Sequence, residues 1–394
     1  MIMGKHFAFV VPPAHGHLNP TLPLVEELIS RGHRVTVVTG QALAGQAARS
    51  GAAVVGLDWH LGTVSTQDGQ YSTDSLVDVL EPYFDQVTAT FPQLVEHFAA
   101  DPVDLVCFDP MGYAGAALAD KLGVRSITLC PSMAANEHVD LRKLWAPQDF
   151  TMDHPRLAAF WDKVARFSAD QGLREELGAM GGPQTDLTLV FVPRDFQLRG
   201  ETFAESFKFL GPSVRVRGRS RDWQPPADER PVLLISLGTA FNNRPEFFAT
   251  CTEAFADSAW HVVMSVGEEV RLDSVPANFE VAAQVPQLAV LEHASVFVSH
   301  AGMGSTMESL HNGVPLVCVP QMAEQALNAD RVQALGLGRV LGSTEVTAQE
   351  LRKAVDEVAA DPAIRAAVKD YSARLRAVDG PTLGADALEE YLSR

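Results

Sequence analysis

The sequence has no apolar run long enough to cross a membrane. Its 394 residues contain no stretch of about 18 apolar residues. The short apolar stretch near the start, residues 7–14, contains two prolines and is followed by His15-Gly16-His17. A secretory signal would need a longer uninterrupted run. The sequence therefore predicts neither a membrane span nor an export signal.

Cysteine is scarce and is not spaced for metal binding. The four cysteines, Cys107, Cys130, Cys251 and Cys318, show none of the paired spacings of a zinc site. Three of them lie in or beside apolar runs, which is typical of small core residues. This usage favours a reducing compartment, and we expect a cytoplasmic protein.

Basic residues are also in short supply. The chain has 31 Lys and Arg against 49 Asp and Glu, a formal net charge of −18. Such a chain repels nucleic acid and anionic membrane surfaces, so small molecules are the expected partners. Any phosphate site must then be built locally, from backbone N–H groups and a few side-chain donors. A hydrophobic content of 46% is ordinary for a folded chain of two or three domains.

Short apolar runs recur along the chain, each followed by polar or turn residues. In the first half we expect strands at residues 7–11, 34–39, 53–57, 103–108, 124–129 and 187–192, with a helix at 22–29. In the second half we expect strands at residues 231–236, 260–265, 279–282, 295–300 and 315–320. Continuous apolar strands are typical of parallel sheets covered by helices on both faces, so the sequence predicts an α/β fold.

The hydrophobic periodicity stops between the two series of strands. The charged segment from Arg215 to Arg221 leads to Pro225-Pro226, and it indicates a solvated connector more than a nucleic-acid site. We therefore predict an N-terminal domain at 1–212, a linker at 213–230, a C-terminal domain at 231–380 and a final amphipathic helix at 381–394.

The turn after the predicted strand 295–300 is rich in small residues. It leads into a helix, whose N-terminal N–H groups and dipole favour an anion. The donors expected at this turn are His300, Gly302, Gly304, Ser305 and Thr306. Thr239, after the strand 231–236, offers a further hydroxyl. Glu308, one turn into the helix, can accept hydrogen bonds from two sugar hydroxyls, so the stretch predicts a site for a nucleoside diphosphate.

A second candidate site follows the first strand. In a doubly wound sheet, residues 12–20 fall at the carboxyl end of this strand, where ligands bind. His17 is the candidate general base, and Asp109, which directly follows the strand 103–108, is its candidate partner. Two other interpretations stay open on the residues alone: His17 as a surface residue, and Asp109 as a cap for a helix near Met111.

These motifs resemble the donor-binding signature of nucleotide-sugar-dependent glycosyltransferases that act on small lipophilic molecules. The matching residues are His300-Ala301-Gly302, Ser305, Glu308, Glu324-Gln325 and, near the start, His17. The chain is most similar to the bacterial macrolide and flavonoid glucosyltransferases. The resemblance implies an α/β fold of two Rossmann-like doubly wound domains facing each other across a cleft, the GT-B type. It also implies that the last helix returns to the N-terminal domain.

The resemblance implies an inverting, metal-independent glycosyltransferase that uses a nucleoside diphosphate sugar and no other cofactor. His17 is then the base, held by Asp109, and Glu324 and Gln325 bind the sugar, which favours UDP-glucose. Gln287 and the Val285 backbone read the base.

Two positions depart from the family pattern. Gln284 stands where many relatives stack a Trp on the base, and Gly304 where many have Asn. The choice between uracil and thymine stays open.

The acceptor is expected to be a macrolide, a flavonoid or another natural product. Segments 59–100 and 133–182 carry scattered aromatic residues among polar, mobile-looking stretches and are expected to form its walls. The acceptor-contact candidates are Phe84, Met111 and Met133. The chain is expected to be a monomer or a dimer.

Three alternatives from other classes were weighed. A nicotinamide oxidoreductase needs a complete Gly-x-Gly-x-x-Gly after a strand, and Gly302-Met303-Gly304 is only a fragment of it. A sugar-nucleotide epimerase of similar build could use the same diphosphate site. A catalytically silent relative of the glycosyltransferases is disfavoured, because the candidate catalytic and donor-binding residues are all present.

Overall fold

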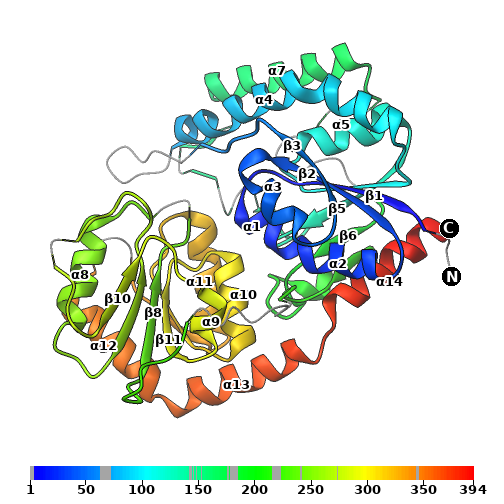
Figure 1. Ribbon diagram of the computed structural model, residues 1–394. Coiled ribbons are helices and arrows are strands. Elements are labelled where there is room, and N and C mark those ends of the chain that lie inside the picture. Colours follow the sequence, from blue (N-terminus) through cyan, green and yellow to red (C-terminus); the bar gives the residue numbers. More distant parts are fainter. Residues whose placement is uncertain are drawn as a thin grey trace. The chain divides into compact units, whose positions relative to one another are not determined.

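The computed structural model describes residues 4–394 except 63–71, 142–143, 145, 148, 152, 175–176, 178–184, 215–222, 240–241, 273 and 343–345. Residues 215–222 of the predicted linker thus lie outside the described residues. The chain forms two compact units (Figure 1). Unit 1 comprises Met1–Ser213 with Asp379–Arg394, and unit 2 comprises Val214–Val378.

Unit 1 is built on a seven-stranded parallel sheet in the order β3-β2-β1-β4-β5-β6-β7. Its strands are β1 His6–Val10, β2 Arg34–Gly40, β3 Ala53–Leu57, β4 Leu105–Phe108, β5 Arg125–Cys130, β6 Thr188–Val190 and β7 Phe207–Phe209. Its helices are α1 His15–Leu18, α2 Leu22–Ser30, α3 Gln41–Ala48, α4 Thr73–Ala100, α5 Tyr113–Leu122, α7 Pro155–Gln171 and α14 Gly380–Ser393. The strand order changes direction between β1 and β4, the kind of switch point at which α/β proteins bind ligands.

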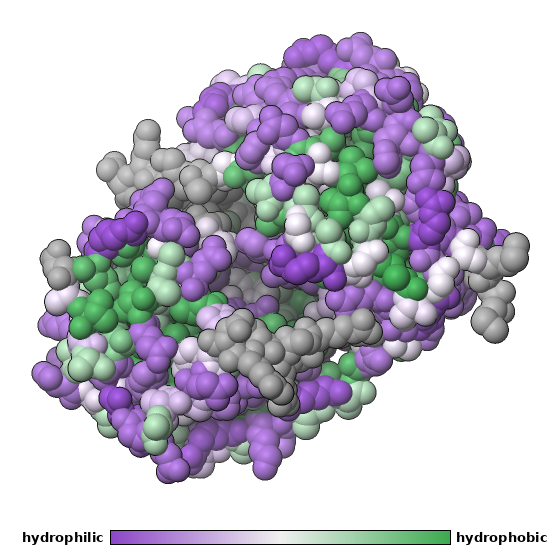
Figure 2. Space-filling view, viewed as in Figure 1, coloured by the Kyte–Doolittle hydropathy of each residue, from purple (hydrophilic) through white to green (hydrophobic). Residues whose placement is uncertain are grey.

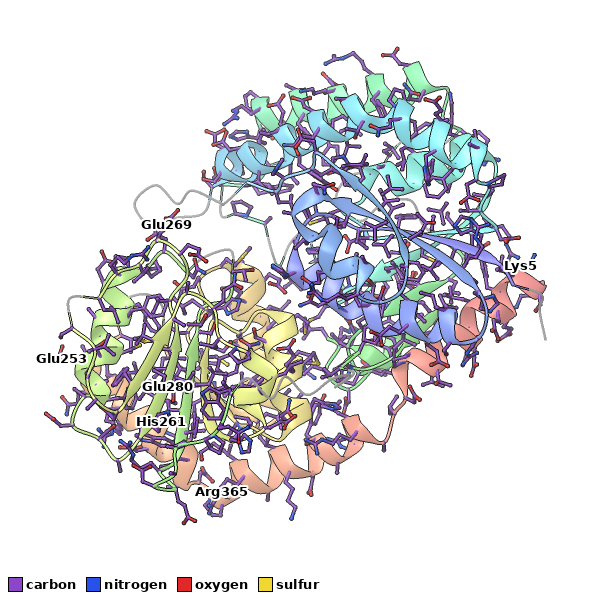
Figure 3. The ribbon with its side chains drawn as sticks, in the orientation of Figure 1. Lys5, Glu253, His261, Glu269, Glu280 and Arg365 are labelled. Atoms are coloured by element: carbon purple, nitrogen blue, oxygen red, sulfur yellow. The ribbon has the colours of Figure 1, made fainter. Side chains whose placement is uncertain are left out.

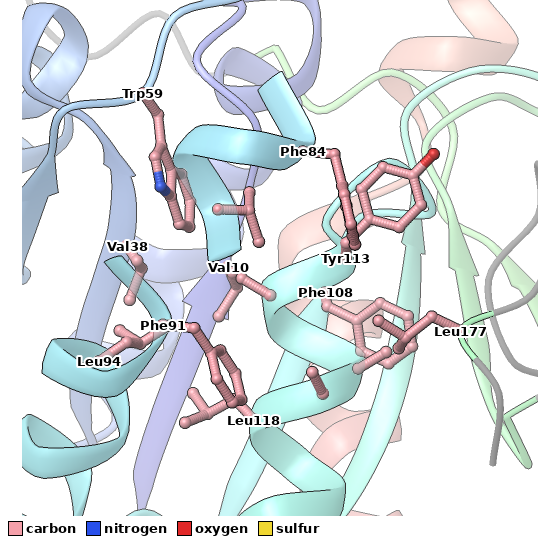
Figure 4. Close-up of a cluster of buried hydrophobic side chains, with 14 of the residues drawn as sticks. Val10, Val38, Trp59, Phe84, Phe91, Leu94, Phe108, Tyr113, Leu118 and Leu177 are labelled. Carbon is pink, nitrogen blue, oxygen red and sulfur yellow. The ribbon is translucent and has the colours of Figure 1, made fainter. Parts of the chain in front are cut away.

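Both faces of this sheet are apolar, which explains why β1 is hydrophobic at every position after His6. Side chains alternate between the faces of a strand. Phe7 and Phe9 pack in one cluster with residues of α2, α3 and α14. Ala8 and Val10 pack in a second cluster with residues of α4, α5 and α7, part of which is shown in Figure 4.

The region around residues 59–100 differs from its predicted form. The polar, mobile-looking stretch predicted there is in large part α4, a helix of 28 residues that packs on α5 and α7. Its aromatic side chains are buried and do not line an open wall: Tyr83, Phe84 and Phe91 have no exposed surface. Pro82 and Pro92 lie inside the helix, and proline interrupts the sequence pattern by which a helix is recognised.

The last helix, α14, belongs to unit 1. It packs against α2 and lies near β7. A Cβ at Gly384 would lie 3.0 Å from methyl groups of both Leu24 and Leu210, so the helix approaches its neighbours closely. The guanidinium of Arg125 lies 3.8 Å from the centre of the Tyr391 ring and donates to the Tyr391 carbonyl oxygen.

Unit 2 is built on a six-stranded parallel sheet in the order β10-β9-β8-β11-β12-β13. Its strands are β8 Val232–Ser236, β9 His261–Ser265, β10 Phe279–Ala282, β11 Ala294–Ser299, β12 Leu316–Cys318 and β13 Gly338–Val340. Its helices are α8 Pro245–Phe255, α9 Gln287–Leu291, α10 Met303–Asn312, α11 Ala323–Ala334, α12 Ala348–Ala360 and α13 Pro362–Arg376. The strand order changes direction between β8 and β11, as it does between β1 and β4 in unit 1.

Hydrophilic side chains cover much of the face of each unit that Figure 2 shows, as expected from a charge of −18. Among the described residues, no helix is long and apolar enough to cross a membrane.

Candidate active site

The switch point of unit 1 brings His17 and Asp109 together. β1 and β4 are neighbours, with Val10 opposite Phe108, so the residues that follow them emerge at the same edge of the sheet. His17 lies on the short helix α1, and its Nδ1 lies 2.7 Å from Oδ2 of Asp109. Asp109 is 1% exposed, and the His17 side chain is 26% exposed. The buried carboxylate therefore has a partner that the solvent can still reach.

Backbone contacts fix Asp109 in place. Its Oδ1 accepts a hydrogen bond from the Met111 N–H at 2.8 Å, and its own N–H donates to the Val10 carbonyl at 3.1 Å. The carboxylate therefore binds the turn before α5 and His17 at the same time, but it is not the cap of α5, whose N-cap is Gly112 and has no side-chain cap bond. Because the carboxylate accepts at Nδ1, the proton of a neutral His17 lies on Nδ1 and Nε2 keeps a lone pair.

The three acceptor candidates do not lie on one surface. Phe84 is fully buried and packs edge-on against Tyr113, Phe160 and Phe167. Met133 is 1% exposed. Met111, at the turn after Asp109, is the one of the three with part of its side chain exposed. In this structure Phe84 and Met133 are core residues, which corrects their predicted placement on the acceptor wall.

In unit 2, two glycines enclose the ring of His300. A Cβ at Gly238 would lie 2.6 Å from Cε1 of this ring, and a Cβ at Gly302 would lie still closer to its Nε2. Neither separation is tolerated between real atoms, and Gly238 also has a φ of +76°, which favours glycine. The turns after β8 and β11 thus need glycine to receive the ring.

His300 is held as a neutral group. Burial lowers the pKa of His300 to about 4, and the backbone of Ser236 opposes this shift only in part. Its Nδ1 is buried and has no hydrogen-bond partner among the described residues. An imidazole with this pKa is uncharged at neutral pH, so it can act there as a neutral hydrogen-bonding group.

The first turn of α10 supplies the predicted anion site. Gly302 is the N-cap, and helix N–H groups at such an end lack intrahelical partners. Gly304 and Ser305 are partly exposed on this turn, and Thr239 is exposed after β8. A Cβ at Gly304 would meet nothing within 4 Å, so a Cβ fits there without a clash. Thr306 differs from its neighbours, because it has no exposed surface and its buried Oγ1 has no hydrogen-bond partner in the part of the chain that the structure describes.

The side chain of Gln287 links α9 to α10. Its Nε2 donates to Oε2 of Glu308 at 2.6 Å and to Oγ of Ser305 at 3.3 Å. Burial raises the pKa of Glu308, and the bond from Gln287 opposes this shift. Gln284 is exposed and Val285 is partly exposed in the segment before α9. The structure thus brings together four predicted donor-site residues: Gln287, Ser305, Glu308 and, at the start of α10, Gly302.

Glu324 and Gln325 lie in the first turn of α11, after β12. Gln325 is 4% exposed, and its Oε1 accepts from the Gln321 N–H at 2.8 Å. Arg244 in turn donates to Oε1 of Gln321 at 2.6 Å. The sequence prediction missed Gln321 and Arg244, which lie 77 positions apart and contact each other only through the fold. The amide oxygen of Gln325 is thus engaged within the protein.

The described residues contain no group of three or more His, Cys, Asp or Glu side chains that could hold a metal ion.

Comparisons with known proteins place these features in one family. Residues 253–390 match the model of the erythromycin biosynthesis protein CIII-like C-terminal domain. NDP-glycosyltransferase YjiC of Bacillus subtilis is 37% identical, with 99% of this chain and 98% of that protein covered. Demethyllactenocin mycarosyltransferase of Streptomyces fradiae is 36% identical, with 98% of this chain and 87% of that protein covered.

Solved structures agree with these relatives. The kitacinnamycin glycosyltransferase has a TM-score of 0.85 at 34% identity, with 99% of each chain covered. The calicheamicin glycosyltransferase CalG4 has a TM-score of 0.83 at 35% identity, with 100% of this chain and 99% of that chain covered. The protein is thus a glycosyltransferase enzyme with two parallel-sheet domains of the GT-B fold, which confirms the predicted fold class and enzyme class. The chain belongs to the family of macrolide and natural-product glycosyltransferases. The relatives and structures named here give the epimerase alternative no support.

Proposed function

We propose that this glycosyltransferase moves glucose from UDP-glucose to a hydroxyl group of a small lipophilic acceptor, such as a macrolide or a flavonoid, with inversion at the anomeric carbon. The observation that carries the proposal is the 2.7 Å contact between His17 Nδ1 and the buried carboxylate of Asp109. The names of two relatives support it: oleandomycin glycosyltransferase of Streptomyces antibioticus and the UDP-glucosyltransferase YojK of Bacillus subtilis.

In this scheme His17 takes the proton of the acceptor hydroxyl. The lone pair of Nε2 accepts this proton while the hydroxyl oxygen bonds to the anomeric carbon. The bond from that carbon to the diphosphate oxygen breaks at the same time, and the diphosphate leaves with the electron pair. Asp109 stabilises the imidazolium that forms, because its carboxylate faces Nδ1. A single displacement of this kind turns an α-linked donor into a β-glycoside.

The leaving diphosphate is stabilised by neutral groups. The N–H groups at the start of α10 and the hydroxyls of Ser305 and Thr239 provide hydrogen bonds where negative charge grows. His300 adds a neutral imidazole in this scheme, since its low pKa leaves it uncharged.

The remaining donor contacts fix the sugar and the nucleoside. Glu324 accepts from sugar hydroxyls, and the amide of Gln325, whose oxygen is bound by the Gln321 N–H, donates to a sugar oxygen. Glu308 accepts from the ribose, and Gln287 with the Val285 backbone faces the base. Since the name of YjiC specifies only a nucleoside diphosphate donor, uridine and thymidine both remain candidates.

We propose further that transfer needs no metal ion. The predicted donors already compensate the diphosphate charge, as a divalent cation would do in other enzymes. Activity should therefore survive excess EDTA in an assay without added magnesium. Complete loss of activity that a divalent ion restores would contradict the proposal.

A mass-spectrometric screen tests the donor and the acceptor together. UDP and TDP sugars are each combined with a panel of phenols, flavonoids and macrolides, and new glycosides are identified by mass. We expect a glucoside of at least one hydroxyl acceptor. Hydrolysis of the donor without transfer to any acceptor, or strict use of another sugar, would overturn the corresponding part of the proposal.

A further inference from the structure

A buried amide on α11 contacts two parts of the donor site. Asn328 has no exposed surface. Its Nδ2 donates to the carbonyl oxygen of Ala301 at 3.0 Å and to Oε1 of Glu324 at 2.9 Å. Both N–H groups of the amide are thereby engaged. One side chain therefore joins the turn after β11 to the carboxylate in the first turn of α11.

The turn that Asn328 holds is strained. Ala301 has a φ of +62°, a left-handed conformation that costs energy for any residue with a Cβ. Its N–H donates to Oγ of Ser299 at 3.1 Å, and its carbonyl accepts from Asn328. Hydrogen bonds on both sides of the residue therefore maintain the conformation. This single residue separates the ring of His300 from the N-cap of α10, so its conformation sets how the two are placed.

The buried amide does not satisfy its own hydrogen-bonding capacity. Oδ1 of Asn328 is buried and has no partner among the described residues. A buried acceptor without a donor destabilises the fold. An apolar side chain would avoid that penalty, but it would lose both hydrogen bonds that the amide donates. The two N–H groups of the Asn328 amide bind the strained turn and Glu324 at the same time, which an apolar side chain does not do.

We propose that Asn328 is a positioning residue of the donor site, which fixes the sugar-binding carboxylate of Glu324 relative to the diphosphate-binding turn at Ala301. This inference rests on the proposed roles of Glu324 and of the α10 turn. Asn328 touches neither sugar nor phosphate in this scheme. Its neutral amide can donate twice without adding charge, whereas an aspartate would repel both the Ala301 carbonyl and the Glu324 carboxylate.

The chain offers a matched control for the loss of a buried amide. Asn278 is 6% exposed, and its Nδ2 donates to the carbonyls of Phe255 and Trp260, each at 2.9 Å. It precedes β10, at the end of the sheet where His261 and Glu280 pair, and the labels in Figure 3 show this place. That end is opposite to the carboxyl ends of the strands. Asn278→Ala should therefore lower stability as Asn328→Ala does, without changing donor binding.

The test compares two ligands that differ only in the sugar. Dissociation constants for UDP and UDP-glucose, and for TDP and TDP-glucose, are measured by calorimetry on Asn328→Ala, Asn328→Asp, Glu324→Ala, the double variant and Asn278→Ala. Thermal unfolding of each variant is recorded. We expect Asn328→Ala to weaken binding of the sugar nucleotide about tenfold or more and binding of the sugar-free nucleoside diphosphate about threefold. Asn328→Asp should weaken binding of both ligands further. In the Glu324→Ala background, Asn328→Ala should no longer change the ratio of the two constants.

A second substitution tests the turn directly. Ala301→Gly removes the Cβ that makes the left-handed conformation unfavourable. It should restore much of the UDP affinity that Asn328→Ala loses, while the loss of sugar contacts remains.

Separate results bear on the two proposals. Equal loss of stability in Asn328→Ala and Asn278→Ala, with both dissociation constants unchanged in the former, would overturn the positioning role. If Glu324→Ala itself leaves the ratio unchanged, the sugar-binding role of Glu324 fails. The positioning role of Asn328 is then tested by UDP alone: Asn328→Ala should weaken UDP binding, and Ala301→Gly should restore it. The role is overturned if Asn328→Ala leaves UDP binding unaffected.

Discussion

Two histidines follow central strands of the two parallel sheets, and their surroundings differ. His17 follows β1, is partly exposed and contacts a buried carboxylate at 2.7 Å. His300 follows β11, has its ring enclosed by Gly238 and Gly302, and has a pKa lowered to about 4. Both positions lie where the strand order of their sheet changes direction.

The difference shows how one residue type can serve opposite tasks. A carboxylate beside an imidazole favours its charged form, which a general base must reach during the reaction. Burial without a neighbouring carboxylate disfavours the charged form of an imidazole. This suits His300, which is proposed to form hydrogen bonds at neutral pH without gaining or losing a proton. The position of each histidine follows from the sheet topology, whereas the groups that contact it set its protonation state.

The largest expected effect concerns His17. His17→Ala removes the proposed base, and loss of a general base slows turnover about 100- to 10,000-fold. Binding of UDP, which we assign to unit 2, should change little. Turnover with a hydroxyl acceptor and calorimetric UDP affinity measure the two quantities. Asp109→Asn should act in the same direction but less severely.

His15→Ala is the matched control, since His15 is the other histidine of α1 and has no assigned role. It should retain most of the rate. A His17→Ala enzyme with more than half of the normal turnover would show that the two histidines do not differ as we describe.

Glu324→Ala should have the next largest effect. A hydrogen bond to a charged carboxylate is worth roughly 1.5–3 kcal/mol, so transfer should fall about ten- to a hundredfold. Free UDP carries no sugar and should bind almost as before. Steady-state rates with UDP-glucose and calorimetry with UDP separate the two. Equal weakening of both ligands would place Glu324 at the nucleotide, not at the sugar.

The donor side of the molecule could be predicted in more detail than the acceptor side. The signature from His300 to Gln325 is nearly continuous in sequence, and two strands, 53–57 and 279–282, match β3 and β10 in full. The i, i+4 spacing of Glu324 and Asn328 is also visible in the sequence, and on a helix this spacing places the two side chains on one face.

The acceptor side gave weaker signals. Phe84 is expected at the acceptor from the sequence because segment 59–100 carries scattered aromatic residues among polar stretches. The structure places it in the core, since Pro82 and Pro92 conceal a long helix. The strands β7 in unit 1 and β13 in unit 2 were also missed, because each contains a basic residue and neither forms a continuous apolar run. Contacts such as that between Arg244 and Gln321 depend on the whole fold of unit 2.

Base discrimination should be affected less than sugar transfer. Gln284 is exposed before α9, at the position where the sequence resemblance implies a Trp that stacks on the base. Stacking acts on uracil and thymine alike. We therefore expect UDP-glucose and TDP-glucose to be used within about tenfold of each other, a gap of roughly 1.4 kcal/mol, and Gln284→Trp to shift that ratio. A preference beyond about a thousandfold in competition assays would mean that other residues read the base.

The smallest expected effect tests the neutral state of His300. Burial holds the pKa of His300 at about 4, below its ordinary value of 6.5. A diphosphate bound beside the ring favours the charged form and raises this pKa. Between the two values the complex binds a proton that the free enzyme does not, so this histidine strengthens donor binding as the pH falls, by less than tenfold per pH unit.

Glu308 acts in the opposite direction, because protonation of its carboxyl, whose pKa burial raises, removes an acceptor for the ribose. The contribution of His300 is therefore the difference between the wild-type protein and His300→Asn. Calorimetry with UDP-glucose from pH 6.5 to 5 measures this difference. The intact donor is used because its diphosphate is a diester that does not titrate in this range, whereas the terminal phosphate of UDP does. We expect proton uptake on binding by the wild-type protein to exceed that of His300→Asn. Identical pH profiles would mean that no diphosphate lies beside His300, and the assignment of the anion site to the turn after β11 would fail.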